Sequence, residues 1–586
     1  MNEKNDYDIK YAASVCAFLF CTAMYAILMH YFGFYYDLND DILMADILSG
    51  GYTGTPDAHN IQMMYPLAWV FKQLYTFFPQ ISWMGVIEIV LMWWCCVLLI
   101  SRTHFLFAKH IESRWRRILG IVGLYASVVV FATGTSLWEL VMVQYTVVCG
   151  FMAATAAFLV CTCEEFTVIG NIPAVILVIL AFNIRSEMLL LLCPFLAAVG
   201  LIRWIPEGIS IKTARKYLGF VGIMVLGICA TLIANKLAYS SEEWKEFDRL
   251  FNARTEVYDF TGIPSYEENK DFYDKFHADI DDYDRLVDYN YCLSNAVTAT
   301  FMENMAQYAD EHSVYKRSIP WAVFENIKQT GTWKTPGGRT QLNTPGSAFY
   351  EDNVKQHIPM NLIVVLFYGM VVVAAVRSKD IKWAYTLPIL FVMRTISWTY
   401  VTYRGRINAR ITHPMYMTEI LILVGVLLFA WIEGDYQSVS IKKAVGRILV
   451  TGWLIVTLIA AAFVPSTIVN DIKAKSEQRE KNNVIRDAIY TYTCANPRTY
   501  YLLDVYSTVG FTQKIFGDTC YGKGNTQLAG GWAAKSPLDE YKSGFYQDKE
   551  EWRFISLDED YCGWVPEETI TASDGVTSVY VYKLEQ

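Results

Sequence analysis

Two groups of charged residues lie beside apolar segments of this chain, and their types point to chemistry at a membrane surface. Asp40 and Asp41 directly follow the first apolar segment, and Arg404, Arg406 and Arg410 lie between two late ones. A carboxylate there can take a proton from an acceptor hydroxyl, while guanidinium groups bind phosphate through paired hydrogen bonds. The combination predicts an anionic lipid substrate and a proton-transfer step. The alternative for the acidic pair is a solvated loop or the cap of a following helix.

The arginine stretch has two candidate local structures. If 404–413 is helical, Arg406, Arg410 and His413 share one face, because they are three or four residues apart. Pro414 instead favours a helix that starts there, with a loop before it. In either case, contact with lipid headgroups or pairing with an acidic outer loop is the structural alternative to phosphate binding.

Three further ionisable residues are candidates for the same site. Arg185 and Glu187 interrupt the apolar stretch 172–202. Ionisable groups inside membrane segments are functional candidates by default, although an ion pair between these two is an equally good account. His59 precedes an amphipathic segment and is a candidate for substrate binding or proton transfer, whereas a lone loop histidine is more often structural. With His413 and the three arginines, these residues make up the predicted substrate-binding set.

The composition is that of a membrane protein with soluble parts. Of 586 residues, 54% are hydrophobic and only 18% are charged, which is too apolar for an ordinary soluble protein. The net charge of -9 argues against nucleic acid as a partner. Most of the 13 cysteines lie in or next to apolar segments, and no CxxC or His-Cys pattern occurs, so no metal site or cofactor is predicted.

Eleven segments are predicted to cross the bilayer, because a spanning helix needs about 20 mostly apolar residues. The long stretch 172–202 is divided into two short helices that meet at or near the outer surface. The predicted spans are 11–32, 81–101, 118–134, 141–163, 172–184, 187–202, 217–239, 359–376, 383–400, 414–432 and 448–468.

The positive-inside rule orients these spans. The basic loop 102–117 belongs in the cytoplasm, and it reaches the cytoplasm only if segment 61–78 does not cross. Segment 61–78 contains Gln62, Pro66 and Lys72, and it is therefore predicted to lie along the outer interface as an amphipathic helix. This topology describes a multi-pass protein of the cell membrane with a cytoplasmic N-terminus, an extracytoplasmic C-terminal domain and both charge groups outside.

The predicted fold class is mainly α, a polytopic helical bundle with two soluble parts. An N-terminal membrane module, 1–239, contains a first catalytic loop, 33–80, and precedes a helical extracytoplasmic loop domain, 240–357. A C-terminal membrane module, 358–469, precedes a small α/β tail domain, 470–586. The elements expected in the soluble parts are helices at 267–288, 291–312 and 471–492, and strands at 500–503, 553–557 and 578–582.

Together, these features resemble the GT-C superfamily of membrane glycosyltransferases, which use sugars linked to polyprenyl phosphate or diphosphate. The likeness covers roughly residues 1–470. It consists of an acidic pair after the first span, an interfacial helix before the second, paired short helices in mid-chain and late extracytoplasmic arginines. The stretch from Asn39 to His59 is similar to bacterial members associated with surface-polysaccharide synthesis. Two departures are Asp-Asp in place of Asp-Glu and the lack of a second-loop acidic motif, so a divalent metal has no support from the sequence.

The resemblance implies that a first-loop acid is the general base and that basic residues hold the lipid phosphate. By position, these roles fall on Asp40 or Asp41 and on Arg404, Arg406 and Arg410. The predicted function is transfer of a sugar, with inversion, from a polyprenyl-phosphate donor to a cell-surface glycan or glycolipid acceptor. The alternatives are a transporter or flippase of lipid-linked glycan, whose arginines would line a path, and a scaffold whose tail recruits partners.

Overall fold

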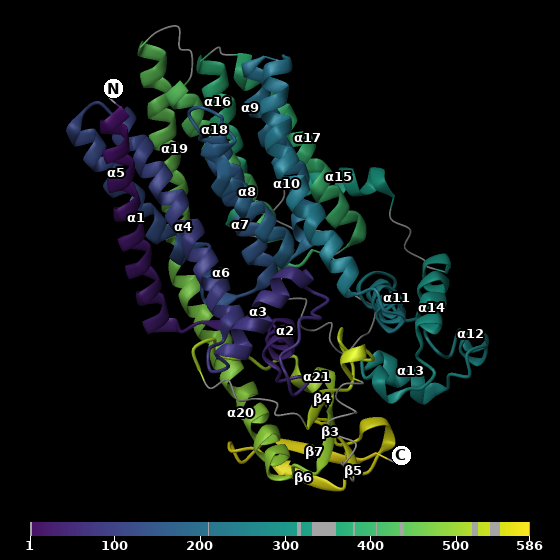
Figure 1. Cartoon of the computed structure of the whole chain (residues 1–586). Helices are drawn as coiled ribbons and strands as arrows, with labels where there is room; N and C mark the ends of the chain where they lie inside the picture. The colour runs from purple at the N-terminus through teal and green to yellow at the C-terminus, as the bar shows by residue number, and fades with distance from the viewer. Residues whose placement is uncertain are drawn as a thin grey trace.

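The apolar helices run side by side along one axis, and the soluble parts gather at one end of them (Figure 1). The computed structural model describes residues 3–208, 210–312, 318–330, 359–378, 381–405, 407–433, 439–517, 525–539 and 551–584. The N-terminus lies at one end of the molecule and the small C-terminal sheet at the other. We call these the N-terminal end and the sheet end of the bundle.

Eight of the described helices are long and apolar enough to cross a membrane, which is consistent with a multi-pass membrane protein. They are α1 (Glu3–Phe32), α4 (Trp83–His110), α5 (Arg114–Gly134), α9 (Ser186–Trp204), α10 (Ile211–Ala238), α16 (Met360–Ser378), α18 (Ala409–Glu433) and α19 (Val439–Ser466). Three other predicted spans correspond to helices outside this set, α7 (Tyr145–Cys161), α8 (Ile172–Ile184) and α17 (Ile381–Arg404). The count of eleven crossings therefore stays a prediction.

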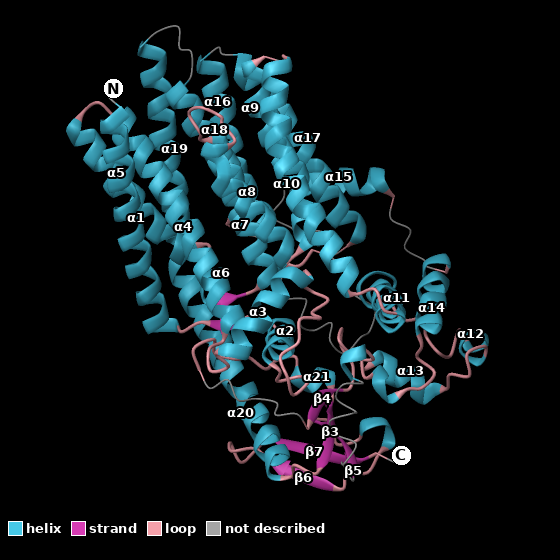
Figure 2. Cartoon of the chain, viewed as in Figure 1, coloured by secondary structure: helices cyan, strands magenta, loops and turns pink. Residues whose placement is uncertain are grey.

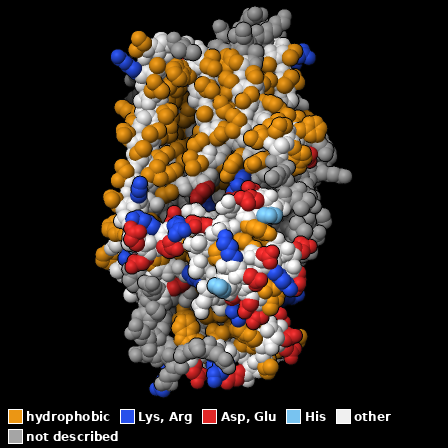
Figure 3. Space-filling model, turned by 90° about the vertical axis from the view of Figure 1, so that its right-hand side faces the viewer, with side chains coloured by type: hydrophobic (Ala, Val, Ile, Leu, Met, Phe, Trp, Pro, Cys, Tyr) orange, Lys and Arg blue, Asp and Glu red, His pale blue; other side chains and the backbone are white. Residues whose placement is uncertain are grey.

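The surface of the molecule divides in the same way. On the face in Figure 3, hydrophobic side chains cover the part formed by the bundle, whereas acidic and basic side chains gather toward the sheet end. A few basic side chains lie at the rim of the N-terminal end. Leu119, Leu226 and Leu458 are each more than two-thirds exposed on the bundle helices. Such side chains are suited to contact lipid rather than water.

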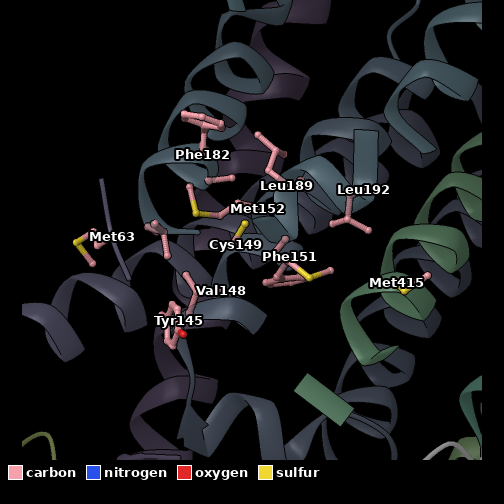
Figure 4. Close-up of a cluster of buried hydrophobic side chains, with 14 of the residues drawn as sticks. Met63, Tyr145, Val148, Cys149, Phe151, Met152, Phe182, Leu189, Leu192 and Met415 are labelled. Carbon is pink, nitrogen blue, oxygen red and sulfur yellow. The ribbon is translucent and has the colours of Figure 1, made fainter. Parts of the chain in front are cut away.

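Helix α7 is the centre of the bundle. All of its residues are buried, since α4, α8, α9 and α18 pack around it, and a helix that is apolar all round is expected in such a place. Two glycines let α18 approach closely. A Cβ on Gly150 would lie 2.2 Å from the Cβ of Pro414, and one on Gly425 would lie 2.8 Å from the Cβ of Cys161. Figure 4 shows side chains of α7, α8, α9 and α18 gathered in one buried cluster.

The mid-chain hairpin has the break that the sequence predicts. Helix α8 ends at Ile184 and α9 begins at Ser186, and Arg185 between them has an extended backbone (φ −153°). The predicted amphipathic segment forms α3 (Tyr65–Phe77), which has 13 residues. Its length of about 20 Å is too short for a hydrocarbon core of about 30 Å. Its exposed residues include the large side chain of Trp69, as an interfacial helix requires.

The loop after α10 folds into several short helices in place of the two long ones expected. They are α11 (Glu242–Glu256), a π-helical turn (Val257–Thr261), α12 (Lys270–Asp274), α13 (Ile280–Val287) and α14 (Ala299–Glu311). The prediction of one helix over 267–288 is wrong, because His277 has a left-handed backbone (φ 56°) and Asp279 caps a new helix. The helix predicted over 291–312 starts late, where Thr298 caps α14.

One further helix, α15 (Ile319–Thr330), belongs to the predicted extracytoplasmic loop domain but packs against the membrane helix α17. Its buried Asn326 accepts a hydrogen bond from Arg394 Nη1 at 3.2 Å, which fixes one face of α15 on α17. Ile319 and Phe324 are 63% and 67% exposed. Helix α15 thus turns an apolar face outward beside the bundle.

The tail domain continues directly from α19. A π-helical turn (Thr467–Lys473) leads into α20 (Ala474–Ala495), and five strands follow in the spatial order β4-β3-β5-β7-β6 (Figure 2). Strand β3 is parallel to β4 and β5, whereas β7 is antiparallel to β5 and β6. The strands are β3 (Thr499–Leu503), β4 (Thr526–Leu528), β5 (Glu551–Ser556), β6 (Glu568–Thr571) and β7 (Ser578–Lys583). The three predicted strands are confirmed as β3, β5 and β7, while the short and polar β4 and β6 are additions.

Candidate active site

The loop that carries the two aspartates is fixed to the start of α7. Strand β1 (Tyr35–Tyr36) pairs in parallel with β2 (Met142–Val143), which precedes α7 directly. The tail domain holds the same loop from the other side, since the Tyr36 amide donates to the Gln513 carbonyl at 3.1 Å. These contacts place α2 (Asn39–Ser49), which carries both aspartates, against the sheet end of α7.

Asp41 is fully buried and accepts hydrogen bonds from two backbone amides. The Leu38 amide donates to Oδ2 at 3.3 Å, which closes the start of α2, and the Tyr145 amide at the start of α7 donates to Oδ1 at 3.1 Å. Burial raises the pKa of Asp41 well above its usual range; the Tyr145 amide opposes this rise, and the charges of Asp37 and Asp40 add to it. Asp41 therefore joins two helices and is closed to a substrate.

Asp40 points instead to α18. Arg410 Nη1 donates to Asp40 Oδ2 at 3.1 Å, across 370 positions of the chain. The two side chains are 22% and 26% exposed for Arg410 and Asp40, so the pair is accessible from outside. The acid of the first loop and one of the late arginines are thus in direct contact.

Arg185 brings a second guanidinium to this place. Its Nη1 donates to the side-chain oxygen of Gln62, its Nε lies 3.2 Å from Glu187 Oε2, and its guanidinium lies 5.3 Å from the centre of the Tyr145 ring. Arg410 is near enough for its charge to act on Arg185. Glu187 is the more exposed partner, with 66% of its side chain accessible. The ion pair between Arg185 and Glu187 that the sequence offers as an alternative exists, and it lies beside the Asp40–Arg410 pair.

His413 lies one turn beyond Arg410 on α18 and forms a buried pair. Its Nδ1 is hydrogen-bonded to Glu139 Oε1, which comes from the short helix α6 (Leu137–Val141). The side chains of His413 and Glu139 are 10% and 5% exposed. Among the described residues, Glu139 Oε2 has no hydrogen-bond partner. This pair anchors the first turns of α18, and thereby Arg410, to the segment before α7.

Two predicted site residues are engaged elsewhere. Arg404 Nη2 donates to Glu256 Oε2 at 2.8 Å, and its guanidinium lies 3.4 Å from the centre of the Phe260 ring. His59 Nδ1 donates to Asp57 Oδ1 at 2.8 Å, and its ring stacks on a tryptophan of α11. Burial raises the pKa of Asp57, but the hydrogen bonds from His59 outweigh it and the net shift is downward. For both residues the structural alternative describes the contacts that are present.

The arginine stretch is not one helix. Helix α17 ends at Arg404, and Gly405 follows with a left-handed backbone (φ 73°). Helix α18 then begins at Ala409, five residues before Pro414, so the expectation of a helix start at the proline is wrong. Arg406 lies outside the described residues.

A tyrosine of the loop domain lies near Asp40 and is hydrogen-bonded to an arginine of the same domain. Arg254 is buried, and its Nη1 donates to the Tyr289 hydroxyl. Burial raises the pKa of Tyr289; the Arg254 charge opposes the rise, and the carboxylates of Asp259 and Asp40 add to it. The influence of Asp40 puts Tyr289 close to the Asp40–Arg410 pair.

Three residues that the sequence does not single out belong to the site. Gln62 and Tyr145 bridge Arg185 to the start of α7, since the Tyr145 hydroxyl donates to Gln62 Oε1 at 3.3 Å. Glu88 of α4 is 1% exposed, its carboxyl oxygens have no partner among the described residues, and its charge interacts with that of Asp41. A polar residue within an apolar segment was the available signal for Gln62 and Glu88. Tyr145 gave none.

A second buried ion pair lies inside the bundle. Arg394 Nε of α17 is 2.8 Å from Glu419 Oε1 of α18, and the side chains are 5% and 0% exposed. The Tyr368 hydroxyl of α16 donates to the same Glu419 oxygen at 2.8 Å. This cluster ties α15, α16, α17 and α18 together and so holds Arg410 in place from the membrane side.

The arrangement has a specific chemical capacity. Asp40 is a partly exposed carboxylate that can accept a proton, and Arg410 and Arg185 can bind an anion beside it. Within the described part of the chain, no group of three or more His, Cys, Asp or Glu is placed to hold a metal ion.

Comparison with known proteins adds no family to these observations. No protein-family model matches the chain, and searches of curated proteins and of solved structures found no significant match.

Proposed function

We propose that the chain is a membrane glycosyltransferase that moves a sugar from a polyprenyl-phosphate donor to a cell-surface glycan or glycolipid. The observation that carries this proposal is the contact between Asp40 and Arg410 at the sheet end of the bundle. It combines a proton acceptor and an anion-binding group at the level where membrane helices meet soluble domains. The GT-C-like features of the sequence support the same assignment.

Asp40 is the proposed general base, and Asp41 is a positioning residue. Asp40 is partly exposed and directed at Arg410, whereas Asp41 is completely buried on two amides. The two residues are adjacent on α2. The hydrogen bonds that Asp41 accepts from two backbone amides therefore set the orientation of Asp40. An acceptor hydroxyl can therefore approach Asp40 but not Asp41.

The proposed step is a single displacement at the glycosyl carbon. The acceptor oxygen forms a bond to that carbon, Asp40 takes the hydroxyl proton, and the bond to the phosphate oxygen breaks with inversion. The polyprenyl phosphate leaves with its electron pair. Arg410 and Arg185 stabilise the charge on the departing phosphate, and a donor of this kind contributes about 10²–10³-fold to the rate.

The proposed orientation places the sheet end outside the cell. Arg114 and Arg116 lie in the first turn of α5 and Lys212 in the first turn of α10, and both helices start at the N-terminal end (Figure 1). The positive-inside rule assigns such a basic end to the cytoplasm. The reaction then takes place at the extracytoplasmic face, where lipid-linked sugars meet envelope glycans.

The decisive experiment compares Asp40→Asn with Asp271→Asn, an exposed aspartate of the loop domain. Membranes that contain each variant are incubated with radiolabelled polyprenyl-phosphate hexoses, and transfer of label to the envelope glycan fraction is followed. Loss of a general base lowers the rate by about 10²–10⁴-fold. We expect that loss for Asp40→Asn alone.

Two results would count against the proposal. An unchanged rate of sugar transfer in Asp40→Asn would exclude Asp40 as the general base. Movement of an intact lipid-linked glycan across the membrane, without transfer of the sugar and unaffected by Asp40→Asn, would favour a flippase.

A further inference from the structure

A buried guanidinium lies at the N-terminal end of the bundle, far from the candidate active site. Arg203 is in the last turn of α9, whereas Arg185 is at its start, so about 27 Å separate the two. Arg203 is 5% exposed. Its Nη2 donates to the Cys163 carbonyl at 2.8 Å, and its guanidinium lies 3.8 Å from the centre of the Phe429 ring.

Two nitrogens of Arg203 are left over. Nε and Nη1 are buried and have no acceptor among the described residues. A buried donor without a partner is destabilising, and a charged one more so. The ring of Phe429 interacts with the face of the guanidinium and does not accept from its edge. Nε and Nη1 of Arg203 therefore lack an anionic or polar partner among the described residues.

The carboxylates of this region are already engaged or exposed. Glu164, next to Cys163 in the chain, has Oε2 2.7 Å from Lys109 Nζ and Oε1 2.7 Å from His110 Nε2. Lys109 is also 2.9 Å from Asp6. Glu165 is exposed and forms no ion pair within the described ranges. No protein carboxylate of this group neutralises Arg203.

A second arginine adds to the excess of positive charge. Arg102 of α4 is half-buried, and the charges of Glu164 and Arg203 both act on it, that of Glu164 favourably. It forms no hydrogen bond or ion pair with any other described residue. Arg102 lies eight residues before the end of α4, which places its Cα about 12 Å inside the helix end. The two guanidiniums thus share a region whose nearby carboxylate, Glu164, is already paired with Lys109 and His110.

We propose that Arg102 and Arg203 form a binding site for the phosphate of an anionic lipid in the leaflet at the N-terminal end. Guanidinium groups match phosphate oxygens through paired hydrogen bonds, and basic pockets between membrane helices suit anionic headgroups. The depth of Arg102 within α4 favours a lipid over a free anion. This site is independent of the proposed glycosyl transfer at the sheet end.

The test uses the full chain in nanodiscs of phosphatidylcholine with increasing phosphatidylglycerol, and native mass spectrometry counts the retained anionic lipids. Arg102→Gln is compared with Arg116→Gln, which removes the same charge from an exposed position at the same end. We expect at least tenfold weaker retention of phosphatidylglycerol in Arg102→Gln and none of this loss in Arg116→Gln. Arg203→Gln should behave like Arg102→Gln. Arg102→Lys keeps the charge but not the paired N–H donors of the guanidinium, so its retention of phosphatidylglycerol should be intermediate.

The result that overturns the proposal is equal retention in Arg102→Gln and in the unmodified chain. Arg102 is used for the decisive comparison because loss of the buried Arg203 can impair folding. A separate arm adds inorganic phosphate without phosphatidylglycerol and follows thermal unfolding. Stabilisation by inorganic phosphate that depends on Arg102, with no retention of phosphatidylglycerol, would assign the site to a free anion and overturn the lipid assignment.

Discussion

Arg410 and Asp40 are in contact at 3.1 Å although 370 positions separate them in the chain. The contact depends on two close packings around α7, since Asp41 ties α2 to the start of α7 and Gly150 admits Pro414 of α18. A shift of either helix, α2 or α18, would therefore disturb the contact between Asp40 and Arg410. The pair therefore reports on the assembly of the N-terminal and C-terminal membrane helices as well as on chemistry.

Replacement of Arg410 should slow sugar transfer, and the more hydrogen-bond donors to the phosphate are lost, the slower the transfer should be. Arg410→Ala is expected to lower the initial rate by about 100-fold or more, because it removes a donor to the leaving phosphate. Arg410→Lys keeps the charge but loses the planar fork, so an intermediate rate is expected. Initial rates of sugar transfer measure both, with Arg249→Ala, an arginine on the exposed face of α11, as the control. A rate for Arg410→Ala within twofold of the unmodified chain would exclude Arg410 from the reaction.

Replacement of Asp41 should reduce stability more than replacement of Asp40. In Asp41→Asn the side-chain NH2 would face a backbone N–H. That N–H would lose its acceptor, which costs about 1–3 kcal/mol of folding free energy. Asp40→Asn breaks a partly exposed pair, which is worth no more than about 1 kcal/mol. Thermal unfolding in detergent should therefore rank the unmodified chain first, Asp40→Asn next and Asp41→Asn last. The reverse order for the two variants would contradict the structural role of Asp41.

The folded chain should lose stability as pH rises toward about 7, because of Asp288, which lies where the loop domain meets the tail domain: the neighbouring Asn290 Nδ2 donates to Asp504 Oδ1 at 2.8 Å. Burial, followed by the carboxylates of Asp504, Asp284 and Asp558, raises the pKa of Asp288 from 3.8 to about 7. The folded protein thus holds a proton that the unfolded chain releases at lower pH. This contribution to stability is present below about pH 4 and is lost as pH rises through about 7.

Asp288→Asn tests that pH dependence. The variant should unfold at a higher temperature than the unmodified chain at pH 8, and the difference should shrink toward pH 5. Asp274→Asn, an exposed aspartate of α12, serves as the control and should follow the unmodified chain. An identical pH profile for Asp288→Asn and the unmodified chain would show that Asp288 does not titrate in this way.

Helix α15 should contact lipid. Phe324 is 67% exposed on the side of α15 away from its contact with α17, whereas Val565 is 86% exposed in the tail domain. A photoreactive phenylalanine at position 324 should form adducts with labelled phospholipid in nanodiscs, and the same residue at position 565 should not. Absence of adducts at 324 would place α15 in water.

The outcome at the site separates what local sequence determines from what it does not. Apolar length located the helices of the bundle, and the polar interruption at Arg185 located the break between α8 and α9, because both effects arise within a few residues of chain. The three strands with apolar or aromatic alternation were predicted for the same reason. The helices of the loop domain were misplaced, since their ends depend on single capping residues such as Asp279 and Thr298.

The roles of equivalent charged residues were decided only by tertiary structure. Asp40 and Asp41 are identical neighbours, yet one is buried on two amides and the other faces Arg410. Arg404 and Arg410 are also alike in sequence, but Arg404 pairs with Glu256 of the loop domain. The sequence determined which residue types lie near this membrane surface, because hydrophobic length and charge are local properties. Which of them meet was decided by the packing of α2 and α18 on α7, since burial and counter-charge come from distant parts of the chain.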